Sequence, residues 1–446
     1  MALSERQNAA ATGDNFGDGD NLGEGKSTGK ESIRKWSPLR RTAFRFVCVY
    51  LVVYNLPFPL NILPQGFPPY DNFWSALTLW VGRHVFHRAV VVPNGSGDTS
   101  GGWVQVFICL AAALLATVLW TVLDQKRPHY DRLYDWLRVY VRFALANVMF
   151  SYGAMKIFPN QFSAPSLDRL LEPFGDASPM GLLWTFMGAS PAYEIFGGML
   201  EMLGGLLLTT RHTTLLGALV CMGVLSNVVA LNFCYDVPVK IFSTHLLLMA
   251  LFLAAPYVGR LIDLFVRGRA VRPAPLHRLF QDRRLDRTAV VLRTLFVAGL
   301  AGMALWQNYQ IYTSKETASR SPLYGLWAVD EWSVNGVTRP PLVTDTAQWH
   351  RVVLSHNTLT VQTVSGTRHR YFMPQGPVGR ALILSRSDDP AWSSALTYTQ
   401  PDPSLLLLAG TLDRQQLRVR LHHEEAQNSL LVRRGFHWVN EFPYNP

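Results

Sequence analysis

The sequence has 446 residues, of which 49% are hydrophobic and 16% are charged. In soluble proteins, roughly a quarter of all residues are charged. Here the charged fraction is lower, and the apolar residues form long runs. A soluble globular protein is therefore excluded, and an integral membrane protein is predicted. The net charge of +10 comes largely from basic residues beside the apolar runs, so nucleic-acid binding is not expected.

Residues 1–40 differ from the rest of the chain. They are rich in Gly, Asn, Asp and Ser and contain few residues that could be buried, so we predict a disordered cytoplasmic tail. The first apolar run begins too late for a secretory signal peptide.

A helical transmembrane domain is predicted over residues 41–310, with about seven spans, each close to the roughly 20 residues that a bilayer needs. The predicted spans are 42–60, 103–122, 138–157, 193–210, 213–234, 239–255 and 288–306. Basic residues concentrate in 33–41, 124–138 and 260–287, and this bias predicts that the N-terminus is cytoplasmic. Residues after about Gln307 are then extracytoplasmic, and the expected location is the bacterial inner membrane or its equivalent.

The third and fourth spans contain charged residues of opposite sign. Lys156 lies near the outer end of the third span, one helical turn after Tyr152. Glu194 and Glu201 share a face of the fourth span, and Glu201 lies roughly 13 Å below the outer boundary. We expect Lys156 to face Glu201 or Glu194 across a helix bundle. The alternative is that Lys156 extends its long side chain to the outer membrane surface.

Further polar residues occur in the outer halves of the fifth and sixth spans and in the short turn that joins them. We predict that they contribute to a ligand site with Tyr152 and Glu194. They are Asn227, Asn232, Asp236, Lys240 and His245. Arg45 and Arg142 lie near the inner edge, where we expect both side chains to extend to the membrane surface.

Two short patterns within residues 138–255 resemble those of a known family. The pattern Tyr152-Gly153-x-x-Lys156, followed by Glu201-x-x-Gly204-Gly205-x-Leu207-Leu208, is similar to that of DoxX-type membrane proteins. The resemblance implies a four-helix bundle, a link to quinone redox chemistry or an accessory role, and a quinone as ligand. It marks only Lys156 and Glu201 as candidate catalytic residues. The segment "YGAMK" also resembles the transmembrane domain of vitamin K-dependent carboxylases, in which a lysine acts as the base.

Residues 321–446 change to short alternating runs separated by Gly, Asn, Asp or Pro. About nine such runs predict a small, extracytoplasmic all-β barrel. Gly325-Leu326-Trp327 resembles the G-x-W signature of lipocalin-like barrels. The resemblance implies that the tryptophan packs across the closed end and that an arginine, here Arg433 or Arg434, covers it.

The sequence contains no haem, iron–sulfur, nucleotide or P-loop motif, and the four cysteines form no C-x-x-C pair. Successive side chains of a strand point to opposite faces, so the tract from His422 to Glu425 cannot gather its side chains on one ion, and no metal site is predicted. Three functional hypotheses follow. The first is a binding or redox-accessory protein that holds a quinone or a membrane lipid in its bundle. The second is a structural or assembly component whose barrel recruits a cell-envelope protein. The third is an enzyme with Lys156 as general base.

Overall fold

The computed structural model describes residues 35–62, 68–91, 96–271, 282–317, 321–374, 377–389, 391–425 and 429–443. Most of the predicted tail lies outside these ranges. Helix α1 (Pro38–Asn55) begins two residues before the predicted end of the tail. Ser37 caps this helix by accepting a hydrogen bond from the Arg40 amide, and Trp36 is buried.

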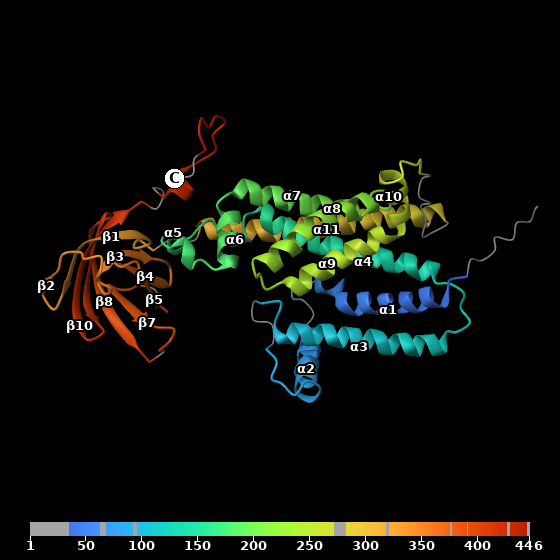
Figure 1. Ribbon diagram of the computed structural model, residues 1–446, viewed down its shortest axis with the longest axis horizontal. Helices are drawn as coiled ribbons and strands as arrows, with labels where there is room; N and C mark the ends of the chain where they lie inside the picture. Colours follow the sequence, from blue (N-terminus) through green and yellow to red (C-terminus); the bar gives the residue numbers. More distant parts are fainter. Residues whose placement is uncertain are drawn as a thin grey trace, which may run out of the picture.

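The long helices, α1 among them, form a bundle with a β-barrel at one end (Figure 1). The helices between α1 and the barrel are α2 (Pro68–His84), α3 (Ser100–Leu123), α4 (Asp131–Ile157), α5 (Leu167–Leu170), α6 (Pro179–Gly188), α7 (Pro191–Leu208), α8 (Thr214–Cys234), α9 (Lys240–Ala254), α10 (Val258–Phe265) and α11 (Arg283–Thr317); the short helix α12 (Leu430–Arg433) follows the barrel. Short 3-10 turns occur at Leu60–Ile62, Phe174–Asp176 and Ala255–Tyr257.

Each predicted span falls on one of the long helices. By length and composition, four described segments could cross a membrane: Ser100–Leu123, Thr214–Cys234, Lys240–Phe265 and Arg284–Thr317. The helices at the other three predicted spans are α1, α4 and α7, which carry charged side chains that the protein itself covers. Arg45, Lys156 and Glu201 are all buried, so these charges do not face the surroundings of the bundle.

Four of the helices form a ring of neighbours. Helix α4 packs on α7, α7 on α8, α8 on α9, and α9 returns to α4, while α11 lies along α4. The core of this ring contains Val141, Leu145 and Met149, which are spaced by one helical turn on α4. Helix α2 crosses the direction of the long helices beside α3 (Figure 1).

Of the two arginines near the predicted inner edge, Arg45 does not extend outward, so the prediction was wrong for this residue. Arg45 is 2% exposed. It donates hydrogen bonds to the Tyr130 hydroxyl (2.7 and 3.0 Å), the Thr121 hydroxyl (2.8 Å) and the Asp124 carbonyl (2.8 Å). This network ties α1 to the turn between α3 and α4. Arg142 is half-buried and donates from Nε to the Leu208 carbonyl at the end of α7 (2.7 Å).

The predicted all-β barrel is confirmed. Its strands are β1 (Gly325–Val334), β2 (Val337–Thr338), β3 (Trp349–Leu354), β4 (Thr358–Thr363), β5 (Arg368–Phe372), β6 (Pro377–Val378), β7 (Ala381–Ser385), β8 (Ser393–Asp402), β9 (Leu405–Leu412) and β10 (Gln415–Glu424). Eight of them close an antiparallel ring, in which β10 pairs with β1; β2 and β6 are two-residue additions. Inward-facing apolar residues of the ring form one continuous core.

Trp327 on β1 is 1% exposed, and its Nε1 donates to the Leu323 carbonyl at 3.0 Å. The residue beside it is His423 of β10, whose ring meets the indole edge-on with 5.2 Å between centroids. A Cβ on Gly325 would lie 2.7 Å from Nε2 of this histidine, which explains the glycine of the G-x-W pattern. The prediction that Arg433 or Arg434 covers Trp327 was wrong, because both residues follow the last strand and are exposed.

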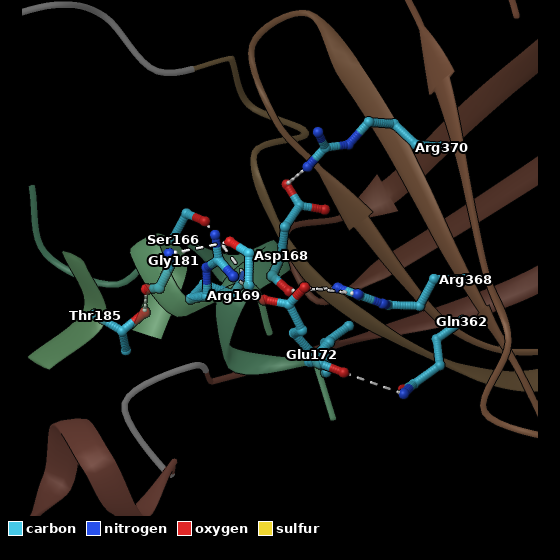
Figure 2. Close-up of polar contacts among 11 residues, drawn as sticks. Ser166, Asp168, Arg169, Glu172, Gly181, Thr185, Gln362, Arg368 and Arg370 are labelled. Carbon is cyan, nitrogen blue, oxygen red and sulfur yellow. Dashed lines mark hydrogen bonds and ion pairs between the residues drawn. The ribbon is translucent and has the colours of Figure 1, made fainter. Parts of the chain in front are cut away.

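The barrel docks on the segment that joins α4 to α7. Figure 2 shows this contact, in which Arg368 lies 2.9 Å from Glu172 and Arg370 lies 3.5 Å from Asp168. Leu167 packs in a small apolar cluster with barrel residues Leu326 and Val353. The barrel therefore covers the end of the bundle at which Lys156 lies.

Candidate functional site

A cavity of about 400 Å³ lies inside the helix ring, between α4, α6, α7, α8 and α9. Apolar and aromatic side chains form most of its wall. Five of the residues predicted from sequence line it: Tyr152, Lys156, Glu201, Asn227 and Asn232. The polar residues Gln161 and Ser243 line it as well.

Lys156 and Glu201 form a buried ion pair on the cavity wall. The Lys156 Nζ lies 2.6 Å from Oε1 and 2.7 Å from Oε2 of Glu201. The two residues are 7% and 4% exposed, so the alternative that Lys156 extends to the membrane surface was wrong. The ring of Tyr152 lies beside the pair, with its centroid 5.6 Å from Nζ. Two opposite charges at this depth need each other, because either one alone would be desolvated without compensation.

Close contact between two helix backbones brings the pair together. A Cβ on Gly198 of α7 would lie 2.7 Å from the Gly153 carbonyl oxygen of α4, and a Cβ on Gly153 would lie 2.9 Å from the Gly198 oxygen. Small residues at such a crossing let the helices approach closely. Lys156 and Glu201 flank this crossing on antiparallel helices, and their long side chains meet across it.

We expect Gly198→Val to separate α4 from α7 and to destabilise the protein by about 1–3 kcal/mol, the usual cost of overpacking. Thermal unfolding of the purified protein in detergent measures this effect. Gly259→Val is the control, because a Cβ there meets nothing within 4 Å. Equal unfolding temperatures for the two variants would contradict the proposed role of the glycine contact.

Further polar groups of the cavity come from α8 and α9. Asn232 is buried, and its Nδ2 donates to the Ser243 hydroxyl at 2.9 Å. Asn227 and Gly223 lie on the same wall and are exposed. On α7, the wall residue Phe196 is 53% exposed. The cavity thus opens to the outside of the bundle on the side of α7 and α8.

Glu194 was expected in the ligand site but lies elsewhere. It is fully buried, and its Oε1 accepts a hydrogen bond from the Phe162 amide at 3.0 Å. This contact fastens the chain that leaves α4 to the first turn of α7. Phe162 itself lines the cavity, so Glu194 shapes the site indirectly.

Asp236 and Lys240 also lie outside the cavity. They form a 2.8 Å ion pair at the turn between α8 and α9, where Asp236 is exposed and has a positive φ of 52°. Asp98, before α3, accepts hydrogen bonds from the amides of Lys240 (2.8 Å) and Ile241 (2.9 Å). These residues therefore secure the start of α9, and nothing in the sequence pattern indicated the part of Asp98.

His245 faces α1 instead of the predicted ligand site. Its Nε2 lies 2.6 Å from the Tyr50 hydroxyl, and its ring stacks on Tyr54 with 3.9 Å between centroids. Its Nδ1 lies 2.7 Å from the Ile241 carbonyl. Both ring nitrogens are thus occupied: the Nε2 contact joins α9 to α1, and the Nδ1 contact is with the backbone of α9 itself.

Helix α6 was missed from sequence as a part of the site. Leu183, Trp184 and Met187 of this helix line the cavity, and the Phe162 ring packs edge-on against Trp184. The run "PMGLLWTFMG" is apolar but too short to span a membrane. A short apolar run of this kind could have predicted a helix that covers the end of a bundle.

The chemistry of the wall suits an apolar ligand with a few acceptor or donor groups. Within the described ranges, no group of three or more His, Cys, Asp or Glu residues is placed to hold a metal ion. A quinone ring fits the donor set, because aromatic walls can stack on it and Tyr152, Lys156 and Asn227 offer hydrogen-bond donors. When bound, a quinone would supply electron transfer, which these side chains do not provide.

Part of this chain is similar in sequence to a known bacterial protein. No protein-family model matches the chain, and no solved structure matches it. The uncharacterized protein YwoB of Bacillus subtilis (strain 168) is 35% identical over 114 residues, which are 25% of this chain and 71% of YwoB. At this identity and coverage of the relative, the chain belongs to the same family as YwoB.

Proposed function

We propose that this protein holds a lipophilic ligand inside its helix bundle, beside the Lys156–Glu201 pair. The observation that carries the proposal is the apolar cavity of about 400 Å³ with this pair on its wall. Binding pockets for small molecules are mostly apolar and have a few placed polar groups, as this one has.

The nature of the polar groups favours a neutral ligand. The charges of Lys156 and Glu201 compensate each other, so the wall offers no unpaired charge to an ion. Two N–H groups of the ammonium point to Glu201, and an ammonium has three. The third can donate to a carbonyl or hydroxyl oxygen of the ligand, with Tyr152 and Asn227 as further partners. A quinone or a neutral lipid meets these requirements.

The opening of the cavity supports entry from a membrane. Exposed wall residues lie on α7 and α8, and α8 is apolar and long enough to cross a bilayer. In our proposal the chain crosses the membrane about seven times, with its basic flanks in the cytoplasm and the barrel outside. A DoxX-like bundle of α4, α7, α8 and α9 would then take its ligand from the bilayer, and the barrel would cover its outer end.

Catalysis by Lys156 as a general base is less well supported. A lysine can act as a general base only when its amine is neutral. Both oxygens of Glu201 lie at hydrogen-bond distance from Nζ, and this arrangement suits the charged amine. We therefore propose binding, with Lys156 and Glu201 as ligand-positioning residues.

Filling the cavity tests the proposal. Gly223 lines the cavity, and a Cβ there meets nothing within 4 Å. We expect Gly223→Phe to reduce the amount of co-purified ligand about tenfold, equivalent to about 1.4 kcal/mol of binding free energy. The measurement is mass spectrometry of an organic extract of the protein purified in mild detergent.

Gly299→Phe is the matched control, because Gly299 is an exposed helical glycine on α11 with equal free space and lies outside the cavity lining. A quinone or lipid near one molecule per protein in the wild type and in the control, but lost in Gly223→Phe, supports a ligand in this cavity. The same extract from all three proteins, or no specific molecule in any, would overturn the proposal.

A further inference from the structure

A second cavity, of about 520 Å³, lies at the opposite end of the bundle from the barrel. It is formed by the first half of α4, the turn between α7 and α8, and the first turns of α11. This end carries the basic segments that predict the cytoplasmic side. It is separate from the ligand cavity, because the two cavities share no lining residue.

Four arginines from these three elements line the second cavity: Arg138, Arg142, Arg211 and Arg293. Among the described residues, two carboxylates, those of Asp135 and Asp286, accompany them. Asp286 lies 3.8 Å from Arg211, so its charge is already partly compensated. The wall therefore has an excess of positive charge.

The fold does not use all of this charge. Arg142 donates from Nε to a backbone carbonyl, and Arg138 donates from a terminal nitrogen to the Tyr257 hydroxyl at 3.0 Å. The Nε of Arg138 is buried without a hydrogen-bond partner. Arg293 has no hydrogen-bond or ion-pair partner among the residues that the structure describes. Several neighbouring guanidinium groups that have N–H donors without partners can bind a planar or tetrahedral anion.

Two further features fit an anion with an apolar part. Helix α8 begins on the rim at Thr214, and its N-cap Thr213 makes no side-chain cap hydrogen bond. The positive end of the helix dipole therefore points to this region. On the same wall, Phe143 and Val290 provide an apolar surface beside the arginines.

We propose that this cavity binds the phosphate of an anionic lipid headgroup at the inner membrane surface. The guanidinium groups contact the phosphate oxygens, and the apolar wall contacts the glycerol and the start of the acyl chains. Basic pockets between membrane helices on the cytoplasmic side bind such headgroups in other proteins. A free phosphate ion shares the recognised group, and the test separates it from a lipid.

The test compares Arg293→Gln with Arg287→Gln. Both residues lie on α11 and both changes remove one positive charge, but Arg287 is exposed and does not line the cavity. Each full-length protein is titrated in detergent micelles with phosphatidylglycerol, phosphatidylcholine or inorganic phosphate. Bound lipid is counted by native mass spectrometry, and thermal unfolding reports phosphate binding.

We expect phosphatidylglycerol to bind the wild type and Arg287→Gln with equal affinity and Arg293→Gln about tenfold more weakly, a difference of about 1.4 kcal/mol. Stabilisation by inorganic phosphate that is lost in Arg293→Gln would assign the site to a free phosphate, which would overturn the lipid assignment. Equal phosphatidylglycerol affinities for the two variants, or equal binding of phosphatidylcholine, would overturn the proposal as a whole.

Discussion

Lys156→Met is expected to lower the free energy of unfolding by about 3–5 kcal/mol, because it leaves Glu201 as a buried charge without a partner. Glu201→Leu should have a similar effect, since it leaves the ammonium unpaired in the same apolar wall. The double variant Lys156→Met, Glu201→Leu removes both charges. We expect it to be close to the wild type in stability, because apolar replacement of a whole buried pair is often neutral or stabilising. Equilibrium unfolding in detergent micelles measures the three values.

Arg267→Met is the control for this cycle. Arg267 also forms an ion pair, but its side chain and that of its partner Asp263 are 55% and 38% exposed, and exposed pairs contribute about 0–1 kcal/mol. A loss of the same size for Arg267→Met and Lys156→Met would show that burial of the pair is not what matters. A double variant as unstable as the single variants would show that the two residues do not act as a pair.

The double variant also separates stability from binding. It keeps the cavity, whose other wall residues are unchanged, and it lacks the donors that we assign to the ligand. A folded double variant that still retains the ligand would show that the pair serves the fold alone. Loss of the ligand from a folded double variant would support positioning by Lys156 and Glu201.

Trp327→Ala is expected to destabilise the barrel by about 3–5 kcal/mol, the usual cost of removing a fully buried tryptophan. Trp327 is 1% exposed, packs in the barrel core and donates its indole N–H to the Leu323 carbonyl. The change therefore creates a large void and leaves that carbonyl without this donor. Pulse proteolysis of the full-length protein at increasing urea concentration measures the stability of the barrel in place.

Trp438→Ala is the matched control, because Trp438 is a tryptophan of the same domain that is 92% exposed. We expect this change to lower the free energy of unfolding by no more than about 0.5 kcal/mol. If Trp327→Ala left the urea midpoint of barrel cleavage unchanged, the indole would not be the central packing residue of this barrel.

The error over Arg433 and Arg434 shows a limit of reasoning from a short motif. The G-x-W pattern located a tryptophan that the barrel buries, because a local pattern specifies the residue and its strand. It did not identify the covering residue, because that depends on where the chain ends its last strand. Strand β10 ends at Glu424, and the pairing of β10 with β1 places His423 over the indole.

The positions of the long helices and the all-β nature of the C-terminal part could be predicted from the amino-acid sequence. Runs of apolar residues and period-two alternation are local patterns, and each reports which side of an element is buried. The sequence also predicted that Lys156 faces Glu201 or Glu194, because opposite charges inside a bundle pair with each other; the structure selects Glu201.

Which elements face each other could not be predicted and is seen in the folded protein. His245 lies on a helix that contributes Ser243 to the cavity, yet its ring meets Tyr50 and Tyr54 of α1. Likewise, the joining segment with α5 holds the barrel through Glu172 and Arg368, which are 196 residues apart in the chain. Such contacts depend on helix rotation and on the approach of distant segments. Periodicity along one element carries no information on either, because it specifies a buried face and not the neighbour that covers it.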